Sequence, residues 1–467
     1  KDSEFKLYVL DGQTAVLDDY LEISPEQRPR LEALLREGRI AVGPWYTMPD
    51  EYLVSGESLI RNLLMGHRKA KEYGADHAMK YGYICDIFGH IAQLPQILAG
   101  FDIHGALIQR AVNMDTTPPH FIWQSPDGTQ CFVNRTPEDF GYGWFYHYVT
   151  EPYNQGWDKD REHLLERAIR MIDKVKQEQN IPVLVLNDAL DHQHITKAAP
   201  WLAKKLEEHY GAEVRFAPLD DLVKTQARFQ DQLPVKIGEL AETSRLAVGT
   251  NILLTYVLSS RYDIKQKNDQ AQNIWEKWAD PLSAIHAIEG RAIRPGFRRT
   301  AYLELIRNHA HDSICGCSVE EVHRDMHYRF RQAITIAEEI IDDCLRQDVA
   351  AMTDHDDPKK MILRIFNPLP YGDRQTVKLR LCFEKNFPAT FCDGEREYER
   401  RPNFELFDKN GNAVPFTLCG VTHDVIHKTA TQYVVDYVDI CVSVDLLPCG
   451  YSELAVIPGD QTRRIRY

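Results

Sequence analysis

Short apolar runs alternate with amphipathic segments in the first half of the chain. Four runs have the length and the β-branched or aromatic content of buried strands: Phe5–Leu10, Lys80–Cys85, Ile103–Ile108 and Ile181–Leu186. Residues 160–177 instead carry an apolar side chain at every third or fourth position, which predicts an amphipathic helix. Strands that alternate with helices are typical of a sheet with helical crossovers.

Three zones of different pattern divide the chain. Residues 1–225 are expected to form an α/β domain with a parallel-rich, incomplete barrel-like sheet, whose ligands bind at the carboxyl ends of the strands. Helical periodicity dominates residues 226–350 and predicts a helical bundle as the middle domain. After a polar break at Thr353–Lys360, residues 361–467 alternate with period two, which predicts an antiparallel β domain.

Composition and charge narrow the class of protein. The chain has 467 residues, 43% hydrophobic and 27% charged, as in folded globular proteins. It has no run of about 18 apolar residues, so no membrane-spanning helix is predicted. A net charge of −14 argues against nucleic acid as a partner, because phosphate binding requires a basic face. The 10 irregularly spaced cysteines and the absence of a signal-peptide pattern predict reduced thiols in a cytoplasmic protein.

Charged residues follow two of the predicted strands. Asp86 comes directly after Lys80–Cys85, and Arg110 comes just after Ile103–Ile108. Because the carboxyl ends of parallel strands meet at one edge of a sheet, the arginine is expected beside the carboxylate, which it would keep ionised. In isolation, Asp86 is equally typical of a helix N-cap and Arg110 of a solvated loop.

A third predicted strand is followed by two more carboxylates, Asp188 and Asp191. Acids at two strand ends of one sheet suggest a catalytic pair of the kind that glycoside hydrolysis requires. An ordinary acidic loop that caps a helix accounts for the same pattern.

Residue types that bind metals or sugars occur in two further segments. His311 and Asp312 form a tight cluster of the kind that binds divalent metals or sugar hydroxyls, although such clusters are often structural. The neighbouring Cys315 and Cys317 are expected to be inert packing residues. Trp45 lies close to an acidic loop and is expected to be either a sugar platform or a core residue.

Six stretches spread over most of the chain occur together, in this order, in one known family. They are LDGQTAVLDDYLEI (10–23), GPWYTMPDEYLVSGESLIRNLL (43–64), CDIFGHIAQLPQIL (85–98), LIQR (107–110), LSSRYDIKQKN (258–268) and NHAHDSICG (308–316). The ordered set resembles glycoside hydrolase family 38, the α-mannosidases, and its bacterial branch most closely. The three predicted zones also resemble the family's layout of catalytic, helical middle and C-terminal β domains.

The resemblance implies a retaining α-mannosidase that removes terminal α-linked mannose from oligosaccharides or glycans. Asp86 matches the catalytic nucleophile, and Arg110 matches an arginine that hydrogen-bonds it. Asp191 is the expected acid/base, with Asp188 as the competing choice. The two carboxyl groups of a retaining enzyme stand about 5–5.5 Å apart.

The resemblance also implies one zinc ion, which anchors the sugar hydroxyls. Asp86 and His311 match two of its ligands. Phe88 and Asp312 match residues that contact the sugar, and Trp45 is expected to add an aromatic platform.

The family carries its two other zinc ligands in a His-x-Asp motif upstream of the LDGQT segment. This chain begins at Lys1 without that motif, so we expect it to be truncated at both ends and to lack the first strand of its catalytic domain. The missing motif is the only support for a non-catalytic carbohydrate-binding relative. A metal-dependent carbohydrate deacetylase is the other alternative. The sequence leaves open which linkage is cut and whether the substrate is a phosphorylated or a free mannoside. It also leaves open the oligomeric state, although an edge-rich β region favours a homodimer.

Overall fold

The computed structural model describes most of the chain, in the ranges 5–137, 141–244, 253–351, 361–384, 387–393, 398–428, 432–459 and 463–465. The chain divides into two compact units. The first comprises residues 1–273 and 295–337, and the second comprises residues 274–294 and 338–467. Helix α13 (Glu320–Ala350) begins in the first unit and ends in the second. The predicted polar break at Thr353–Lys360 lies outside the described residues.

A five-stranded sheet with the order β3-β4-β6-β5-β7 lies at the centre of the first unit. Its strands are β3 (Gly82–Ile84), β4 (Gly105–Ile108), β5 (His120–Gln124), β6 (Gln130–Arg135) and β7 (Val235–Ile237). Three neighbouring pairs are parallel, and only the β5–β6 hairpin is antiparallel. A separate parallel pair is formed by β1 (Tyr8–Leu10) and β2 (Ile40–Val42). The prediction of an α/β domain with a parallel-rich sheet is therefore confirmed.

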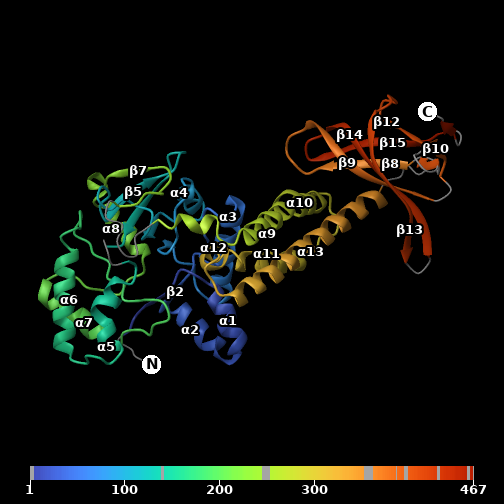
Figure 1. Ribbon diagram of the computed structural model, residues 1–467. Coiled ribbons are helices and arrows are strands. Elements are labelled where there is room, and N and C mark those ends of the chain that lie inside the picture. Colours follow the sequence, from blue (N-terminus) through green and yellow to red (C-terminus); the bar gives the residue numbers. More distant parts are fainter. Residues whose placement is uncertain are drawn as a thin grey trace. The chain divides into compact units, whose positions relative to one another are not determined.

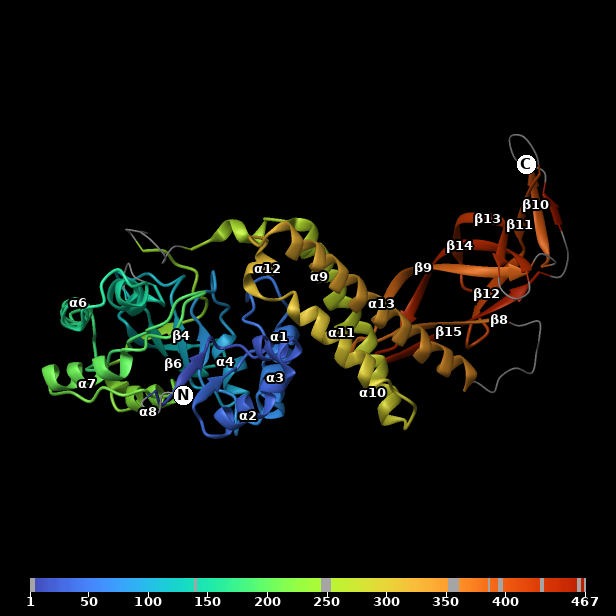
Figure 2. The same cartoon turned by 90° about the horizontal axis from the view of Figure 1, so that it is seen from below.

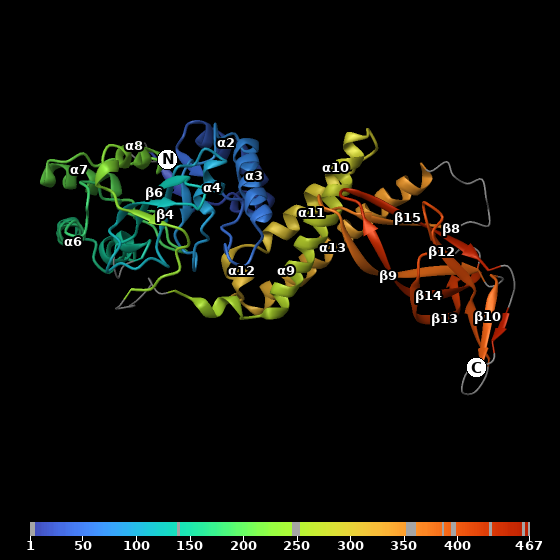
Figure 3. The same ribbon diagram turned by 90° about the horizontal axis from the view of Figure 1, so that it is seen from above.

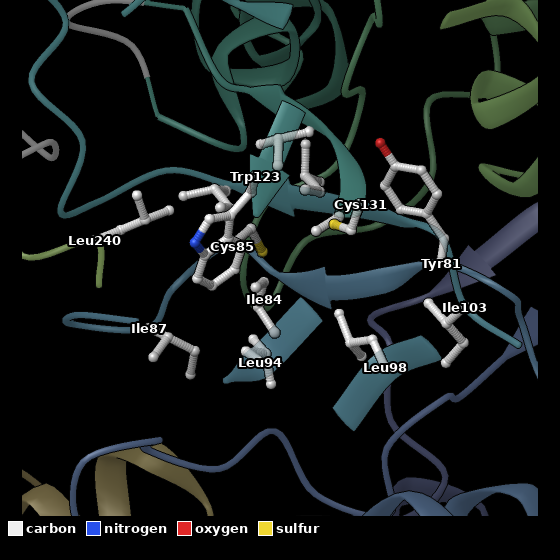
Figure 4. Close-up of a cluster of buried hydrophobic side chains, with 14 of the residues drawn as sticks. Tyr81, Ile84, Cys85, Ile87, Leu94, Leu98, Ile103, Trp123, Cys131 and Leu240 are labelled. Carbon is white, nitrogen blue, oxygen red and sulfur yellow. The ribbon is translucent and has the colours of Figure 1, made fainter. Parts of the chain in front are cut away.

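Apolar side chains from both the strands and the connecting segments form the core around this sheet (Figure 4). Ile84 from β3 and Trp123 from β5 have no exposed surface, and neither has Leu98, which comes from a flanking helix. Burying a side chain of this size stabilises the fold by about 1.5–3 kcal/mol. The sheet is thus a rigid base for the residues that follow its strands.

The predicted strand at Ile181–Leu186 differs from the structure. Val183 and Val185 pack against the core of the sheet, whereas Leu184 and Leu186 pack against the cluster around the neighbouring helices. The side chains thus alternate between two sides, as in a strand. Residues 181–186 are all described, yet they pair with no neighbouring strand and border a cavity. A strand requires a ladder of backbone hydrogen bonds in addition to alternation.

Helices flank the sheet on both sides. In Figures 1 and 3, α6 and α7 lie on one side of the sheet, and α3 and α4 lie on the other. Helix α6 occupies most of the predicted helix 160–177, and the predicted apolar face is buried through Leu164, Ala168, Ile172 and Val175. The helices before residue 230 are α1 (Ala15–Ile23), α2 (Arg28–Arg36), α3 (Gly56–Glu72), α4 (Leu94–Ala99), α5 (Glu151–Asn154), α6 (Arg161–Val175), α7 (Ala199–Tyr210) and α8 (Asp220–Ala227).

Helices dominate the part of the chain after β7, as predicted. β7 itself lies inside the range 226–350 that was expected to be helical, and it pairs with β5. The helices of this part are α9 (Tyr262–Ile274), α10 (Asp280–Ile288), α11 (Pro295–Arg307), α12 (His311–Cys315) and α13. Figure 2 shows α9, α11 and the first half of α13 side by side. Buried hydrogen bonds join this bundle to the first part of the chain: Thr47 Oγ1 donates to the Ile306 carbonyl at 2.9 Å, and Asn268 Nδ2 donates to the Leu53 carbonyl at 2.9 Å. None of the described helices combines the length and the apolar character that spanning a membrane requires.

The second unit contains the predicted antiparallel β structure (Figure 3). One sheet has the order β12-β15-β8 and another has the order β13-β14-β9. Their inward side chains form one core, which includes Phe383, Val438 and Ile440. The strands of this unit are β8 (Met361–Asn367), β9 (Asp373–Glu384), β10 (Ala389–Asp393), β11 (Tyr398–Pro402), β12 (Phe404–Asp408), β13 (Phe416–Lys428), β14 (Gln432–Leu446), β15 (Gly450–Pro458) and β16 (Arg463–Ile465).

Candidate active site

The ends of β3 and β4 bring Asp86 and Arg110 together. Ile84 and Ile108 are register partners in this parallel pair. Asp86 follows Ile84 by two positions, and Arg110 follows Ile108 by two positions. Arg110 Nε and Nη2 both donate to Asp86 Oδ1, at 3.2 and 2.7 Å. Two charge-assisted bonds to one carboxylate oxygen fix its orientation. The strand register thus determines the geometry of this ion pair.

His311 reaches the same carboxylate from the helical part of the first unit. Its Nε2 lies 3.4 Å from Asp86 Oδ2. The Met48 carbonyl lies 3.1 Å from His311 Nδ1 and also accepts the His311 backbone N–H at 2.9 Å. The adjacent Pro49–Ala310 β-bridge holds the two segments together. Nε2 is therefore the ring nitrogen that faces the carboxylate.

The protonation of this cluster follows from burial and charge. Burial lowers the pKa of His311, but the hydrogen bond to Asp86 and the charges of Asp312 and Asp86 raise it to about 9. Burial likewise raises the pKa of Asp86, whereas His311 and Arg110 lower it, and the net effect is a lowered pKa. Asp86 is thus held in its ionised form.

A buried hydrogen-bonded pair stabilises the loop that follows Asp86. His90 Nδ1 lies 2.7 Å from Glu51 Oε1, and both side chains are fully buried. Glu51 Oε2 also accepts the backbone N–H of Ile91 at 2.9 Å. The loop from Asp86 to His90 is consequently fixed at both ends.

The two candidate acids after residue 186 have different surroundings. Asp191 is exposed, lines the cavity and accepts a 2.5 Å hydrogen bond from the Tyr142 hydroxyl. Asp188 Oδ1 instead accepts hydrogen bonds from Thr150 Oγ1 at 2.6 Å and Thr196 Oγ1 at 3.0 Å. Burial raises the pKa of Asp188 even though both hydroxyls lower it. Both residues contribute to the lining of the cavity, but Asp191 is exposed, whereas Asp188 is bonded to two protein hydroxyls.

A cavity of about 1690 Å³ unites these groups within the first unit. Asp86, Asp191, His311 and Asp312 all contribute to its lining. Apolar residues of β1, β3 and the 181–186 segment form part of its wall. It is larger than a pocket for a typical small ligand, which is about 300–1000 Å³, and it has ample room for a sugar.

Two residues of this cavity were not predicted from the sequence. Tyr142, besides its bond to Asp191, is positioned by Gln109, whose Oε1 accepts the Tyr142 backbone N–H at 2.8 Å. Asp11 lies at the end of β1, and burial together with the charge of Asp191 raises its pKa to about 6 despite a hydrogen bond from Gln13. Asp11 sits in the quoted LDGQT stretch and could have been selected because it follows a predicted strand.

The remaining predicted residues have mixed outcomes. The Phe88 ring meets the His311 ring edge-on at a centroid distance of 5.8 Å and lies 5.9 Å from the Arg110 guanidinium carbon. Asp312 is exposed at the cavity. The prediction of Trp45 as a sugar platform is wrong: its ring has no exposed surface, packs in the core of the sheet and donates through Nε1 to the Tyr83 carbonyl at 3.0 Å.

Asp86 and His311 have the chemistry of a divalent metal site. Zinc accepts carboxylate oxygen and imidazole nitrogen at about 2 Å, so two of its ligands lie at most about 4 Å apart, and the observed separation is 3.4 Å. The neighbouring His309 has no such role, because its Nε2 bonds to Asn268 Oδ1 at 2.8 Å and burial lowers its pKa to about 3.

Comparison with known proteins identifies the family whose fold this chain shares. The model of the glycosyl hydrolases family 38 N-terminal domain matches residues 2–234, and that of the alpha mannosidase middle domain matches residues 253–347. A putative mannosylglycerate hydrolase from Halalkalibacterium halodurans is 27% identical over 402 residues, which are 82% of this chain and 43% of that protein. Alpha-mannosidase 2C1 from Mus musculus is 34% identical over 127 residues, 26% of this chain and 12% of that protein.

A solved structure resembles the whole chain. The alpha-mannosidase from Enterococcus faecalis V583 matches with a TM-score of 0.81 and 26% identity, over 100% of this chain and 52% of that one. The chain thus spans about half the length of the relatives that match most of it. Both the family models, in order along the sequence, and the likeness in fold lead to one conclusion: the chain belongs to glycoside hydrolase family 38.

Proposed function

We propose that this chain contains the catalytic site of a retaining α-mannosidase that removes terminal α-linked mannose from oligosaccharides or glycans. The observation that carries the proposal is the Asp86 carboxylate, which is bonded to Arg110 at 2.7 Å, lies 3.4 Å from His311 and opens on the cavity. An ionised carboxylate held in a fixed orientation beside a metal-ligating imidazole is suited to nucleophilic attack.

The first half of the reaction forms a covalent intermediate. An Asp86 oxygen attacks the anomeric carbon, and the bond from that carbon to the leaving oxygen breaks. Asp191 gives its proton to the leaving oxygen, which departs as the alcohol. Tyr142, which donates to Asp191 at 2.5 Å, holds the acid toward the cavity.

The second half regenerates the enzyme. Asp191, now a carboxylate, takes a proton from water while the water oxygen attacks the anomeric carbon. The bond between this carbon and Asp86 breaks, and the free sugar retains its configuration after two inversions. In this step Arg110 stabilises the departing Asp86 carboxylate, because its two donors bind the same oxygen of that carboxylate.

Asp86 and His311 are two of the ligands that we propose for a divalent zinc ion. When bound, the ion supplies Lewis-acid binding of sugar hydroxyls. The Met48 carbonyl, 3.1 Å from His311 Nδ1, orients the ring so that Nε2 is available for coordination. His311→Ala is expected to lower the metal content and the mannosidase activity together. Full metal content in this variant would exclude the ligand role.

We further propose a cytoplasmic location and mannose-containing glycans as the partners. The nine cysteines whose side chains the structure describes are free thiols, which supports a reducing compartment. Homodimer formation through the β region stays a prediction that sedimentation of the full-length protein tests.

The anomeric configuration of the first product tests the proposal. The full-length protein is incubated with an aryl α-mannoside, and proton NMR follows the free mannose before it equilibrates. We expect α-mannose first. Initial β-mannose would indicate inversion by direct attack of water. A protein that binds mannosides and never hydrolyses them would be a non-catalytic relative, and release of acetate from an acetylated sugar alone would indicate a deacetylase.

A further inference from the structure

Three potential metal ligands converge on the turn that follows His311. They are a carboxylate oxygen of Asp312 and the sulfurs of Cys315 and Cys317, which all lie within 4.8 Å of one another. Cys315 is buried, as expected for a packing residue, but Cys317 is exposed, so the packing prediction is wrong for Cys317. An exposed thiol beside a carboxylate and a second thiol has the composition of a binding site for soft cations.

The backbone brings the two sulfurs to the same side. Helix α12 ends at Cys315, and Gly316 adopts φ +91°, the left-handed conformation that reverses the chain after a helix. Cys317 Sγ consequently lies 3.2 Å from Asp312 Oδ1, and both sulfurs approach the Asp312 carbonyl, at 3.5 Å from Cys315 and 3.7 Å from Cys317. A side chain at position 316 would also collide with Arg261, because a Cβ there would lie 2.8 Å from its Cγ.

Neighbouring contacts hold this turn in place. Lys265 Nζ donates to the carbonyls of Ile314 and Cys315, at 2.9 Å each. Phe88 packs with Cys315 in a small apolar cluster on the buried side. The turn is therefore organised by groups other than the three potential ligands, and a cation would find them close to their final positions.

We propose that Asp312, Cys315 and Cys317 bind a thiophilic divalent cation, such as Zn²⁺ or Cd²⁺. This site adjoins the pair Asp86 and His311, because Asp312 Oδ1 lies 3.9 Å from His311 Nε2, but it uses neither of those side chains as a ligand. Zinc–sulfur and zinc–oxygen bonds are about 2.3 and 2.0–2.2 Å long, so a sulfur and an oxygen on one ion lie at most about 4.5 Å apart. Cys317 Sγ lies 3.2 Å from Asp312 Oδ1. Two thiolates and one carboxylate carry three negative charges, one more than the divalent ion needs for neutrality, and they leave its fourth position to water. The two thiol protons pass to solvent on binding, so affinity rises with pH.

Such a site would make thiophilic ions competitive inhibitors. Asp312 lines the cavity, and it is one of the residues that we expect to bind the sugar. Its carboxylate cannot coordinate an ion and bond a sugar hydroxyl in the same geometry. Excess Cd²⁺ should therefore raise KM for a mannoside more than it lowers kcat. The cation site itself does not depend on the proposed mannosidase activity, and binding is measured without substrate.

Cadmium alone is the probe for the binding test. The full-length protein is kept reduced and titrated with Cd²⁺, and the ultraviolet charge-transfer absorbance of the cadmium–thiolate bond is recorded. A second thiol pair, Cys419 and Cys441, has its sulfurs 3.1 Å apart in the second unit, so all proteins carry Cys419→Ser as a background. We expect one thiolate-bound Cd²⁺ per chain in this background.

Variants then locate the ion. Cys317→Ser, which keeps an exposed hydroxyl in place of the thiol, should weaken Cd²⁺ binding by about tenfold or more and reduce the absorbance. His311→Ala should leave the absorbance intact, because its ring is not one of the three ligands. Asp312→Asn should weaken binding while both thiolates keep absorbing at saturation. Circular dichroism checks that each variant is folded.

Two results would overturn the proposal. One is a Cd²⁺ titration of the Cys419→Ser background that gives no thiolate absorbance. The other is an absorbance that Cys317→Ser leaves unchanged, which would assign the ion to other cysteines. The cadmium titration contains no substrate, so its result does not depend on whether the protein hydrolyses mannosides.

Discussion

The two carboxylates that we assign to catalysis are held in different ways. Asp86 stands two residues beyond a paired strand, and Arg110 stands at the equivalent position of the neighbouring strand. Asp191 follows an extended segment, 181–186, that pairs with no strand although all its residues are described. Its carboxylate accepts a hydrogen bond from Tyr142, another side chain outside the sheet.

The difference between Asp86 and Asp191 shows which part of the site the backbone positions and which part depends on side-chain contacts. A parallel ladder sets the relative positions of the side chains that follow it, so the ion pair at Asp86 needs no further support. An acid on a loop depends on individual side-chain contacts for its direction. We therefore expect substitutions at the strand ends to change the chemistry itself, and substitutions around Asp191 to change which substrates still react.

The largest effect is expected from Asp86→Asn. The amide is a poor nucleophile, so turnover of an aryl α-mannoside should fall by about a thousandfold or more, which is roughly 4 kcal/mol of barrier. Circular dichroism should show an unchanged fold. Asp19→Asn, at an exposed position on α1, is the matched control and should keep full activity. Activity of Asp86→Asn within about tenfold of the wild type would remove Asp86 from the role of nucleophile.

Asp191→Ala is expected to have an effect that depends on the leaving group. Mannosides with poor leaving groups need protonation, and their kcat/KM should fall by about 100- to 10,000-fold. The phenolate of an activated aryl mannoside leaves without a proton, so the kcat/KM of the variant for these substrates should stay much closer to the wild-type value. The ratio of the two rates is the measurement. Equal losses for both classes would assign the acid/base role to another group, with Asp188 as the next candidate.

A smaller loss is expected from Arg110→Lys. Lysine keeps the positive charge but cannot place two donors on Asp86 Oδ1 as the guanidinium does, at 2.7 and 3.2 Å. The value of kcat/KM should fall by about 10- to 100-fold, for good and poor leaving groups alike, which corresponds to roughly 1.4–2.7 kcal/mol. A loss confined to poor leaving groups would connect Arg110 to the acid/base instead.

The smallest effect on activity is expected from Asp188→Asn, because Asp188 bonds to Thr150 and Thr196. Its effect should appear in the pH dependence of stability. Burial raises the pKa of Asp188 in the folded state, so the folded protein binds the proton more tightly than the unfolded chain. The free energy of unfolding therefore falls as the pH rises from the unfolded to the folded pKa. Asparagine removes this dependence.

Thermal unfolding measures that prediction. The melting temperature of Asp188→Asn, relative to the wild type, should rise across this pH interval and then stay constant. Thr196→Val, which removes one hydroxyl that bonds Asp188 at 3.0 Å, should strengthen the pH dependence because it leaves the charged form less stabilised. A pH-independent difference between Asp188→Asn and the wild type would show that Asp188 ionises normally.

The sequence was sufficient where a local pattern determines the structure. Short apolar runs identified β3 and β4, and a period of 3.6 identified α6. The rule that sites form at strand ends placed Arg110 beside Asp86. The approach of His311 was expected only from the family resemblance, because nothing in the pattern brings residues 86 and 311 together. Their separation of 3.4 Å depends on the Met48 and Ala310 segments, which are far apart in sequence.

Other features could not be predicted because they depend on burial or on pairing partners. Trp45 stands near carboxylates in the sequence, but the fold turns its ring into the core. The side chains of the 181–186 segment alternate as in a strand. Alternation shows only that the segment lies between two surfaces, and it does not show that another strand pairs with the segment. Tyr142 reaches Asp191 through a loop that Gln109 positions, and no spacing rule connects residues 109, 142 and 191.

Covalent trapping of the glycosyl-enzyme is the most direct test of Asp86 as the nucleophile. A 2-deoxy-2-fluoro mannosyl fluoride reacts with a retaining enzyme to form a glycosyl-enzyme that hydrolyses slowly, and peptide mass spectrometry then locates the sugar. We expect one fluoromannosyl group per chain, attached to Asp86 and absent in Asp86→Asn. A sugar attached to Asp191, or the absence of any adduct in a protein that hydrolyses mannosides, would contradict the assignment of Asp86 as the nucleophile.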